Sequence, residues 1–402
     1  MPSSQIVDLA SRFGTVALLV EHSRDVLDAR PSGGDPPAAL VSRGWAGFLE
    51  SLSDASLERL EIEGLAADWP SDMPASLGEL VRAAREICAV PELDRSQPTG
   101  RPQRKLETPR KSAQVDAFAP LVLPYARRAT RVLDVGSGHG HLGRELAQRI
   151  ALPVVGLERD RRIAERARSL PGQVSFAELD VLRDGLPVQE GDCVIGLHAC
   201  GELGDAIVQS AAEHRASVAL VGCCLQKRRD SARAPLSIDS RTEDALVLPT
   251  RLLGLSNLTA REEGVEATRE ENLRARERRL ALHRLLSERV GPLRFGAEID
   301  GLNRRTAHAS LDTLVERAFA HRRLPLPSAI DRAAAASWAH QAHARARRLS
   351  LPRTMLARVL EVFVLCDRAR FLEQRGFTVE LGTVFPASLS ARNLGLFAAP
   401  SR

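Results

Sequence analysis

A short glycine-rich segment carries the residue types and spacing best suited to chemistry. Residues 132–143 read VLDVGSGHGHLG, in which an apolar run with Asp134 near its end precedes Gly136, Gly138 and Gly140. Glycine has no Cβ, so such a segment can turn sharply at positive φ and let a ligand approach its backbone. The segment therefore predicts a ligand-binding loop that joins a strand to a helix.

Two classes of nucleotide ligand use a glycine loop after a strand, and the spacing separates them. The dinucleotide fingerprint G-x-G-x-x-G would need a third glycine where His141 stands. The observed G-x-G-x-G, with Asp134 two residues before it, is similar to the loop of class I S-adenosylmethionine (SAM) methyltransferases. A carboxylate repels a phosphate but attracts the cationic amino and sulfonium groups of SAM, so we expect SAM as the cofactor. The loop residues predicted to hold it are Gly136, Ser137, Gly138 and Gly140.

Polar residues follow four further apolar runs, which are predicted as strands. These runs are 153–157, 174–179, 192–197 and 217–221. The carboxyl ends of parallel strands line one crevice of an open α/β sheet. There, Glu158 would accept the ribose hydroxyls, and Asp180 with the Val181 amide would meet the adenine. The residues expected to converge are Asp134, Glu158, Asp180, His198 and Cys223. The alternative is that each acid only ends its strand.

His198 is the candidate catalytic base. It is the residue predicted beside the methyl group that titrates near neutrality. A weak nucleophile such as a hydroxyl must lose its proton during methyl transfer, and a positioned base contributes about 10²–10⁴-fold. The alternative is a structural hydrogen bond from His198 to a neighbouring loop.

Histidine and cysteine near the same site raise the question of a metal. His198, Cys200, Cys223 and Cys224 offer nitrogen and sulfur ligands that suit zinc. Adjacent cysteines seldom bind one ion well, and the paired C-x₂₋₄-C spacing is absent, so the sequence predicts no metal. Small buried residues packing near the cofactor are the favoured interpretation.

The candidate substrate contacts are Lys111, Cys200, Cys223, Arg392 and Asn393. Lys111 and the preceding Arg110 could meet a substrate phosphate or the SAM carboxylate, or form a solvated basic linker. Arg392 and Asn393 lie between the last two predicted strands, where they could position the substrate or form a polar turn.

Composition excludes several other classes of protein. The 402 residues are 44% hydrophobic and 27% charged, as in ordinary globular chains, and six cysteines show no disulfide framework. No apolar run approaches the ~18 residues of a membrane span, and the first residues lack a signal-peptide pattern. We therefore expect a cytoplasmic protein without a membrane partner. The oligomeric state is left open.

The chain divides into five predicted segments. A helical N-terminal domain, with capping residues at Ser53 and Ser76, precedes a basic linker. The first part of the SAM-binding α/β domain follows, and an Arg-rich helical insertion separates it from a C-terminal helix and β-hairpin. The boundaries are 1–92, 93–112, 113–224, 225–353 and 354–402.

The insertion supplies the candidate nucleic-acid surface, which makes RNA a possible partner. Phosphate binding by arginines would be strongly salt-dependent. Acidic residues interrupt the first cluster, and few aromatic residues are available for base stacking, so a solvated helix face is the favoured alternative. The arginines are Arg274, Arg276, Arg278, Arg279, Arg284, Arg322, Arg323, Arg345, Arg347 and Arg348.

Several motifs together resemble the methyltransferase-like protein 25 family, which shares the methyltransferase domain 32 module. They are VLDVGSGHGHLG, GLHACGEL (196–203), VGCC (221–224), SLSARNLGLFA (388–398), ETPRKSAQV (107–115) and VFVLCDRARFLEQRGF (362–377). The resemblance implies a SAM-dependent methyltransferase with a seven-stranded Rossmann-like sheet and an antiparallel C-terminal hairpin strand. One departure is His139, where the family usually has lysine.

The acceptor is not set by the resemblance. His-x-Cys-Gly after the fourth strand and Cys-Cys after the fifth are also similar to tRNA 2′-O-methyltransferases, so RNA is slightly favoured. The alternatives are a protein or small-molecule acceptor, or a SAM-binding interaction protein without catalysis.

Overall fold

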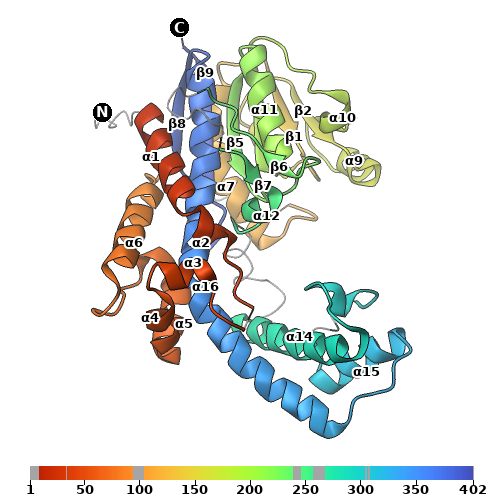
Figure 1. Ribbon diagram of the computed structural model, residues 1–402. Helices are drawn as coiled ribbons and strands as arrows, with labels where there is room; N and C mark the ends of the chain where they lie inside the picture. Colours follow the sequence, from red (N-terminus) through yellow and green to blue (C-terminus); the bar gives the residue numbers. More distant parts are fainter. Residues whose placement is uncertain are drawn as a thin grey trace. The chain divides into compact units, whose positions relative to one another are not determined.

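The computed structural model describes most of the chain as two compact units (Figure 1). The described residues are 9–32, 34–93, 104–238, 246–256, 268–303, 306 and 308–401. One unit comprises Met1–Ser23, Ala83–Ala260 and Leu356–Arg402, and the other comprises Arg24–Arg82 and Arg261–Met355. Each unit is thus built from segments that are distant in the sequence.

The first unit holds a seven-stranded sheet in the order β3-β2-β1-β4-β5-β9-β8. The strands are β1 (Arg131–Val135), β2 (Val154–Glu158), β3 (Ser175–Glu178), β4 (Asp192–Ala199), β5 (Ser217–Gly222), β8 (Phe377–Thr383) and β9 (Leu394–Pro400). Strands β1 to β5 pair in parallel, whereas β9 is antiparallel to both β5 and β8. The sheet confirms the predicted fold class, with the antiparallel strand contributed by the late hairpin.

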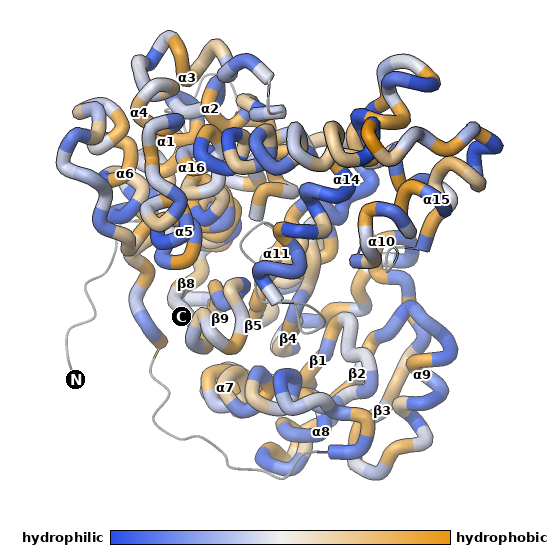
Figure 2. Tube along the Cα trace, turned by 90° about the horizontal axis from the view of Figure 1, so that it is seen from below, coloured by the Kyte–Doolittle hydropathy of each residue, from blue (hydrophilic) through white to orange (hydrophobic). Residues whose placement is uncertain are grey.

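Helices on the sheet bury its apolar side chains. They include α7 (Pro109–Ala126), α8 (His141–Ala147), α9 (Arg161–Arg168), α11 (Glu202–Glu213) and the last part of α16 (Ala329–Glu373). The same unit contains α10 (Val181–Asp184), which packs against α11, and α1 (Leu9–His22), whose Phe13 stacks on Phe363 of α16. Phe118 of α7 packs on Phe397 of β9 with ring centroids 5.7 Å apart, in a cluster that includes Ile195 of β4. Strands buried on both faces read as continuous apolar runs, as the orange stretches of the central strands show (Figure 2).

The segment after β5 is short and irregular where the structure describes it. It contains the two-stranded pair β6 (Ala232–Arg233) and β7 (Leu248–Pro249), followed by α12 (Thr250–Leu253). The predicted basic linker extends partly over residues 94–103, which lie outside the described residues. Its last residues, including Lys111, form the first turn of α7.

The second unit is helical. Its elements are α2 (Arg24–Asp28), α3 (Ala38–Ser42), α4 (Ala46–Ser51), α5 (Asp54–Glu63), η1 (Gly64–Ala66), α14 (Arg269–Val290), η2 (Ala297–Ile299) and α15 (Leu311–His321), together with parts of α6 (Ala75–Cys88) and α16. Leu285 of α14, Phe319 of α15 and Ala339 of α16 share one buried cluster. This unit is therefore built from helices that precede the α/β domain in the sequence and from helices that lie between its two parts.

The predicted helix caps differ in their outcome. Ser53 caps α5 by accepting a hydrogen bond from the Ser56 amide at 3.1 Å. Ser76 was expected to cap α6, but that helix begins at Ala75, so the expectation was wrong; its hydroxyl instead accepts a hydrogen bond from the Trp45 indole at 2.9 Å. Among the described residues, no helix is both long and apolar enough to cross a membrane.

Candidate functional site

The glycine loop between β1 and α8 has the backbone geometry that the sequence predicted. Gly136, Gly138 and Gly140 have φ values of 69°, 56° and 73°, a region that favours glycine. Space is also limiting at Gly140, where an added Cβ would lie 2.3 Å from Cζ of Phe176. The loop therefore needs glycine for conformation at all three positions and for packing at Gly140.

A buried arginine that the sequence did not single out supports this loop. Arg144 of α8 is 3% exposed, and its guanidinium lies 4.9 Å from the centre of the Phe176 ring. Its nitrogens donate hydrogen bonds to the carbonyl oxygens of His139, Gly140, Ala167, Leu170 and Pro171. Because one planar guanidinium binds carbonyl oxygens of both segments, it fixes the glycine loop against the end of α9 and the residues that follow it. No signal in the sequence pointed to this role, because most of the carbonyl partners of Arg144 lie more than twenty residues later in the chain.

Asp134 lies at the base of the loop and is 3% exposed. Its Oδ2 accepts a hydrogen bond from the Gly143 amide at 3.2 Å. Burial raises the pKa of Asp134 to about 6, although Lys111 and the Gly143 amide oppose that shift, and Glu158 adds to it. A cation that approached this carboxyl group would favour its ionised form.

Glu158 ends β2 and is oriented by backbone amides. Its Oε2 accepts a hydrogen bond from the Gly138 amide, and its Oε1 accepts one from the Asp160 amide, both at 3.0 Å. Each carboxylate oxygen has a further lone pair, so these bonds leave capacity for the two ribose hydroxyls. The same carboxylate therefore links the glycine loop to the expected ribose position.

A cavity of about 470 Å³ lies at the carboxyl ends of β1 to β4. This volume is within the usual range of small-molecule sites. Its lining includes Gly136, Glu158, Asp180, Val181, His198 and Cys200 from the predicted site, together with Glu202, Leu203, Lys227, Arg228 and Arg229. Of the residues that the strand pattern predicted to converge, Glu158, Asp180 and His198 line this cavity, whereas Asp134 and Cys223 are not among its lining residues.

Asp180 also has a structural role. It is the N-cap of α10, where its carboxylate accepts a hydrogen bond from the Leu182 amide at 3.2 Å. The alternative interpretation of Asp180 as a polar strand terminator therefore holds alongside its position in the cavity wall.

His198 is held in an unusual backbone conformation at a bulge. The register between β4 and β5 shifts between Leu197 and Ala199, and His198 has φ 72°. Such strain costs about 1–3 kcal/mol for a residue other than glycine and often occurs at functional sites. Burial, followed by the charges of Lys111, Arg110 and Arg392, lowers the pKa of His198 to about 4, so its imidazole is neutral at pH 7.

The partner of His198 was not predicted from the sequence. Nε2 of His198 lies 2.9 Å from Oε1 of Gln114, which is buried on α7. If that oxygen accepts the bond, Nε2 carries the proton and Nδ1 keeps a lone pair. Gln114 gave no signal in the sequence, because a glutamine in an amphipathic helix is unremarkable.

Lys111 lies near His198 and Asp134. Burial lowers the pKa of Lys111, while the nearby charges of Asp134, Glu107 and Cys223 raise it. The predicted contacts Cys200, Cys223 and Arg392 also lie together. The sulfurs of Cys200 and Cys223 are 2.6 Å apart, and Nη1 of Arg392 is 2.9 Å from Sγ of the adjacent Cys224. Asn393 differs, because its buried amide group binds Arg358 and the Phe385 carbonyl oxygen.

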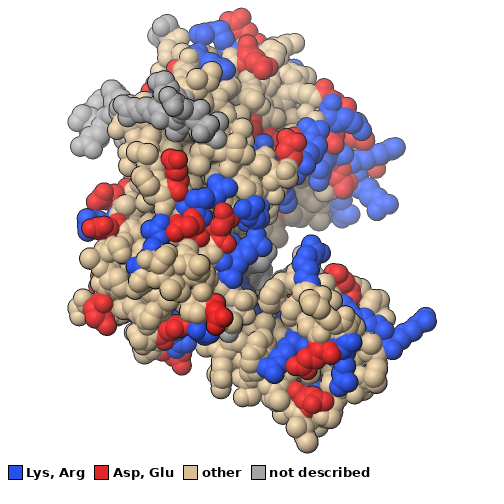
Figure 3. Space-filling model, viewed as in Figure 1, with Lys and Arg blue, Asp and Glu red and all other residues tan. Residues whose placement is uncertain are grey.

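Many arginines of the helical unit are engaged in ion pairs. Arg345, Arg347 and Arg348 pair with Glu50, Glu61 and Asp54, respectively. Further pairs are Arg274–Glu270, Arg279–Glu298 and Arg284–Glu288. Acidic and basic side chains are intermingled on the face drawn in Figure 3. This mixing is typical of a solvated helix surface and reduces the net charge available to a polyanion.

The site residues fit SAM in three respects. Asp134 is a buried carboxyl group whose ionised form a nearby cation would stabilise, and the loop glycines at positive φ present no Cβ to an approaching ligand. In addition, Oγ of Ser137 is buried without a hydrogen-bond partner among the described residues. A ligand with a cationic end and polar groups would satisfy all three features.

Residues 110–230 match the model of the Methyltransf_32 family, which is described as a methyltransferase domain. Curated relatives are the glutathione S-transferase C-terminal domain-containing proteins of Xenopus laevis, 25% identical over 140 residues, and Mus musculus, 29% identical over 118 residues. The alignments cover 34% and 29% of this chain but only 23% and 19% of the relatives. The chain therefore spans less than a quarter of the relatives' length.

Similar solved structures include CalS10, an amino pentose methyltransferase from Micromonospora echinaspora with bound SAM. It is 24% identical with a TM-score of 0.24, covering 27% of this chain and 50% of that one. Magnesium protoporphyrin IX methyltransferase of Synechocystis, with bound SAH, is 21% identical with a TM-score of 0.24, covering 30% and 61%. The Pyrococcus abyssi tRNA (uracil-54, C5)-methyltransferase is 21% identical with a TM-score of 0.23, covering 30% of each chain.

The sheet order and the family match define a class I methyltransferase domain, whose cofactor is SAM. They confirm the methyltransferase domain that the sequence motifs implied. The matched residues extend from the first turn of α7 to the segment after β5, and so include the glycine loop, Glu158, Asp180, His198 and the cysteines.

Proposed function

We propose that this protein is a SAM-dependent methyltransferase that acts on an acceptor reached through the cavity at the carboxyl ends of β1 to β4. One observation carries the proposal: Gly136, Glu158, Asp180 and His198 line the same cavity, and the buried carboxyl group of Asp134 lies two residues before Gly136 on β1. We also place the chain near the methyltransferase-like protein 25 family, on its motifs.

When bound, SAM supplies an electrophilic methyl group on a sulfonium, and the protein contributes mainly by positioning. Asp134 would attract the amino end, and Glu158, which already accepts a hydrogen bond from the Gly138 amide, would accept hydrogen bonds from the ribose hydroxyls. The neutral imidazole of His198 accepts a proton at Nδ1 from the acceptor, while Nε2 donates to Gln114. Because burial lowers the pKa of His198 to about 4, it is available as a base at neutral pH but is a weak one.

RNA is the slightly favoured acceptor in this proposal. Lys227, Arg228 and Arg229 line the cavity and would attract a phosphate backbone. Arg229 pairs with Glu202 and Arg228 with Asp205, which reduces that attraction. A protein side chain or a small molecule is therefore the alternative acceptor, and a SAM-binding protein without catalysis is the alternative of another class.

The cofactor assignment is tested by isothermal titration calorimetry with SAM. Glu158→Ala should weaken SAM binding by about 1–3 kcal/mol because it removes the acceptor of the ribose bonds. Glu178→Ala on the neighbouring strand β3 is the matched control and should bind SAM normally. Equal affinity of the wild type and Glu158→Ala would refute the ribose assignment, and tighter binding of NAD than of SAM would refute the cofactor.

The acceptor is tested with labelled SAM. Total RNA and soluble protein extract from a strain lacking this protein are incubated with the wild type and with His198→Ala. We expect label in RNA, reduced about 10²-fold or more by His198→Ala. Label only in protein would contradict the RNA proposal, and SAM binding without any transfer would favour the non-catalytic alternative.

A further inference from the structure

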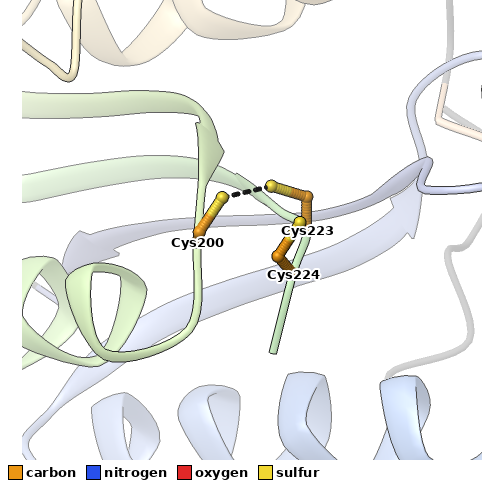
Figure 4. A group of neighbouring side chains, drawn as sticks. All are labelled: Cys200, Cys223 and Cys224. Atoms are coloured by element: carbon orange, nitrogen blue, oxygen red, sulfur yellow. Dashed lines mark hydrogen bonds between the residues drawn. The ribbon is translucent and has the colours of Figure 1, made fainter. Parts of the chain in front are cut away.

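Three cysteine side chains converge at the ends of β4 and β5. Cys200 directly follows β4, and Cys223 and Cys224 directly follow β5. Their sulfur atoms all lie within 4.8 Å of one another. Figure 4 shows Cys200 pointing across to Cys223, with the sulfur of Cys224 beside them. Within the described part of the chain, these three thiols form a compact group of soft ligands.

The strand pairing explains why residues distant in sequence meet here. Ala199 pairs with Gly222 at the end of the parallel ladder, so Cys200 and Cys223 occupy neighbouring positions just beyond it. In a continuing strand, Cys223 and Cys224 would point to opposite faces. The chain leaves the strand after Gly222, which allows both sulfurs to face Cys200.

A cation lies beside one of the three sulfurs, whereas the other two thiols face a carbonyl oxygen and must give up those hydrogen bonds when they ionise. Nη1 of Arg392 donates to Sγ of Cys224 at 2.9 Å. The thiols of Cys200 and Cys223 both donate to the carbonyl oxygen of His198, at 3.2 and 3.4 Å. A guanidinium on one sulfur offsets part of the charge that would gather if all three thiols were ionised.

We propose that Cys200, Cys223 and Cys224 bind a zinc ion through three thiolates. Three protein ligands and one open position are typical of zinc sites that exchange a ligand, and thiolate is a preferred donor for this ion. No fourth histidine, cysteine or carboxylate joins the group among the described residues, so water or another small ligand would complete the coordination. The site does not depend on the proposed methyltransferase activity.

Binding requires only a small side-chain movement. Zinc–sulfur bonds of about 2.3 Å in a tetrahedral arrangement place two sulfurs about 3.8 Å apart. Sγ of Cys200 and Sγ of Cys223 are 2.6 Å apart without an ion, so they must separate by about 1.2 Å. Rotation about the Cα–Cβ bonds of partly buried side chains can supply that change. The proposal departs from the sequence-based expectation that adjacent cysteines would not share an ion.

The location gives the ion a structural consequence. Cys200 lines the cofactor cavity, and Cys223 and Arg392 line a second, much smaller cavity of about 30 Å³. An ion here would join the ends of β4 and β5 directly after the bulge at His198. Metal content should therefore affect the rigidity of the cavity wall.

The test is the metal content of the full-length protein, purified without a histidine tag and dialysed against a weak chelator. Mass spectrometry for elements should find about one zinc per chain. Cys223→Ser and Cys224→Ser should each lower the zinc content at least about tenfold, since loss of one of three ligands leaves a weak site. Cys88→Ser, on α6 and outside the cluster, is the matched control and should retain the ion.

A second measurement uses only the wild type, so its result does not depend on whether the cysteine variants fold. Cobalt added to the metal-free protein should give the strong sulfur-to-metal absorption of thiolate coordination, and zinc should abolish it. Metal-free protein in which Cys200, Cys223 and Cys224 are all reduced, and which still gives no cobalt spectrum, would overturn the proposal. A loss of two hydrogens in mass, mapped to a Cys200–Cys223 disulfide, would replace it with a redox pair. SAM titration of the zinc-free protein shows separately whether the proposed function fails.

Discussion

At the scale of single residues, the charge of Asp134 is set by its surroundings. Burial raises its pKa to about 6, against an ordinary value near 3.8, while Lys111 opposes and Glu158 reinforces that shift. The ionised carboxylate therefore carries a free-energy penalty in the ligand-free protein above about pH 6. That penalty disappears as the pH falls below the ordinary pKa. A cationic ligand relieves it by favouring the ionised form.

SAM affinity should consequently depend on pH. We expect constant affinity above about pH 7 and a decrease of up to about tenfold per pH unit below about pH 6, as Asp134 becomes protonated. Calorimetry between pH 5 and pH 8 measures this dependence. Asp134→Asn should bind weakly at every pH, whereas Glu178→Gln should behave as the wild type. A wild-type affinity independent of pH would show that Asp134 does not meet the cationic end.

The bond between Gln114 and His198 can be tested without knowing the acceptor. Gln114→Glu places a carboxylate 2.9 Å from Nε2 of His198, which should raise the pKa of His198 from about 4 by about 1–3 units. Titration of the imidazole by NMR measures the shift. Gln148→Glu, at the end of α8, should leave the pKa of His198 unchanged. An unchanged pKa of His198 in Gln114→Glu would mean that residue 114 does not hydrogen-bond to His198.

At the scale of elements, the loop from β1 to α8 depends on two separate properties of glycine. Gly138 and Gly140 both have positive φ, but only Gly140 is crowded. An added Cβ at Gly138 meets nothing within 4 Å, whereas at Gly140 it meets Phe176 and the Arg144 guanidinium. This pair therefore separates backbone strain from steric overlap.

We expect Gly138→Ala to lower the free energy of unfolding by about 1–2 kcal/mol through backbone strain. Gly140→Ala should cost about 1–3 kcal/mol more, because Phe176 or the loop must move. Urea unfolding of the two variants measures the difference. Equal destabilisation would contradict the proposed packing of Phe176 against the loop.

At the scale of the whole chain, buried ion pairs join segments that are distant in sequence. Asp205 of α11 binds Arg233 of β6 and Arg368 of α16, and Arg233 also binds Asp367. Burial alone would raise the pKa of Asp205, but the charges of Arg368 and Arg233 hold it well below its usual range. Its contribution to stability is therefore present above about pH 4 and is lost as the pH falls further.

Removing Asp205 should lower the free energy of unfolding far more than removing a carboxylate that pairs with an exposed arginine. Asp205→Ala leaves two buried arginines without their shared carboxylate, and we expect a loss of about 3–5 kcal/mol in the free energy of unfolding. Glu202→Ala is the control on the same helix; it breaks a pair with the largely exposed Arg229 and should cost about 0–1 kcal/mol. Denaturant unfolding at pH 7 compares them. A similar small loss for both would show that the buried network adds little.

The sequence predicted the parts of the site that depend on local pattern. Glu158 and Asp180 were identifiable because each ends an apolar run, and the glycines because their spacing permits a tight turn. Gln114, Arg144 and Asp205 were not identifiable, because each acts through a partner on another element. The arginines of α16 were predicted as a candidate RNA surface, but their carboxylate partners lie on helices almost 300 residues earlier.

By itself, the sequence determined the succession of strands along the chain, the glycine loop and the position of the acids that follow the strands. These features arise from periodicity and backbone freedom, which act over a few residues. Only the tertiary structure decided which side chains meet: His198 with Gln114, the buried Asp205 network, and three cysteine sulfurs within 4.8 Å of one another, which the sequence had placed only near the same site. Such contacts depend on how separate elements pack, and no local pattern encodes the partner of a residue a hundred positions away.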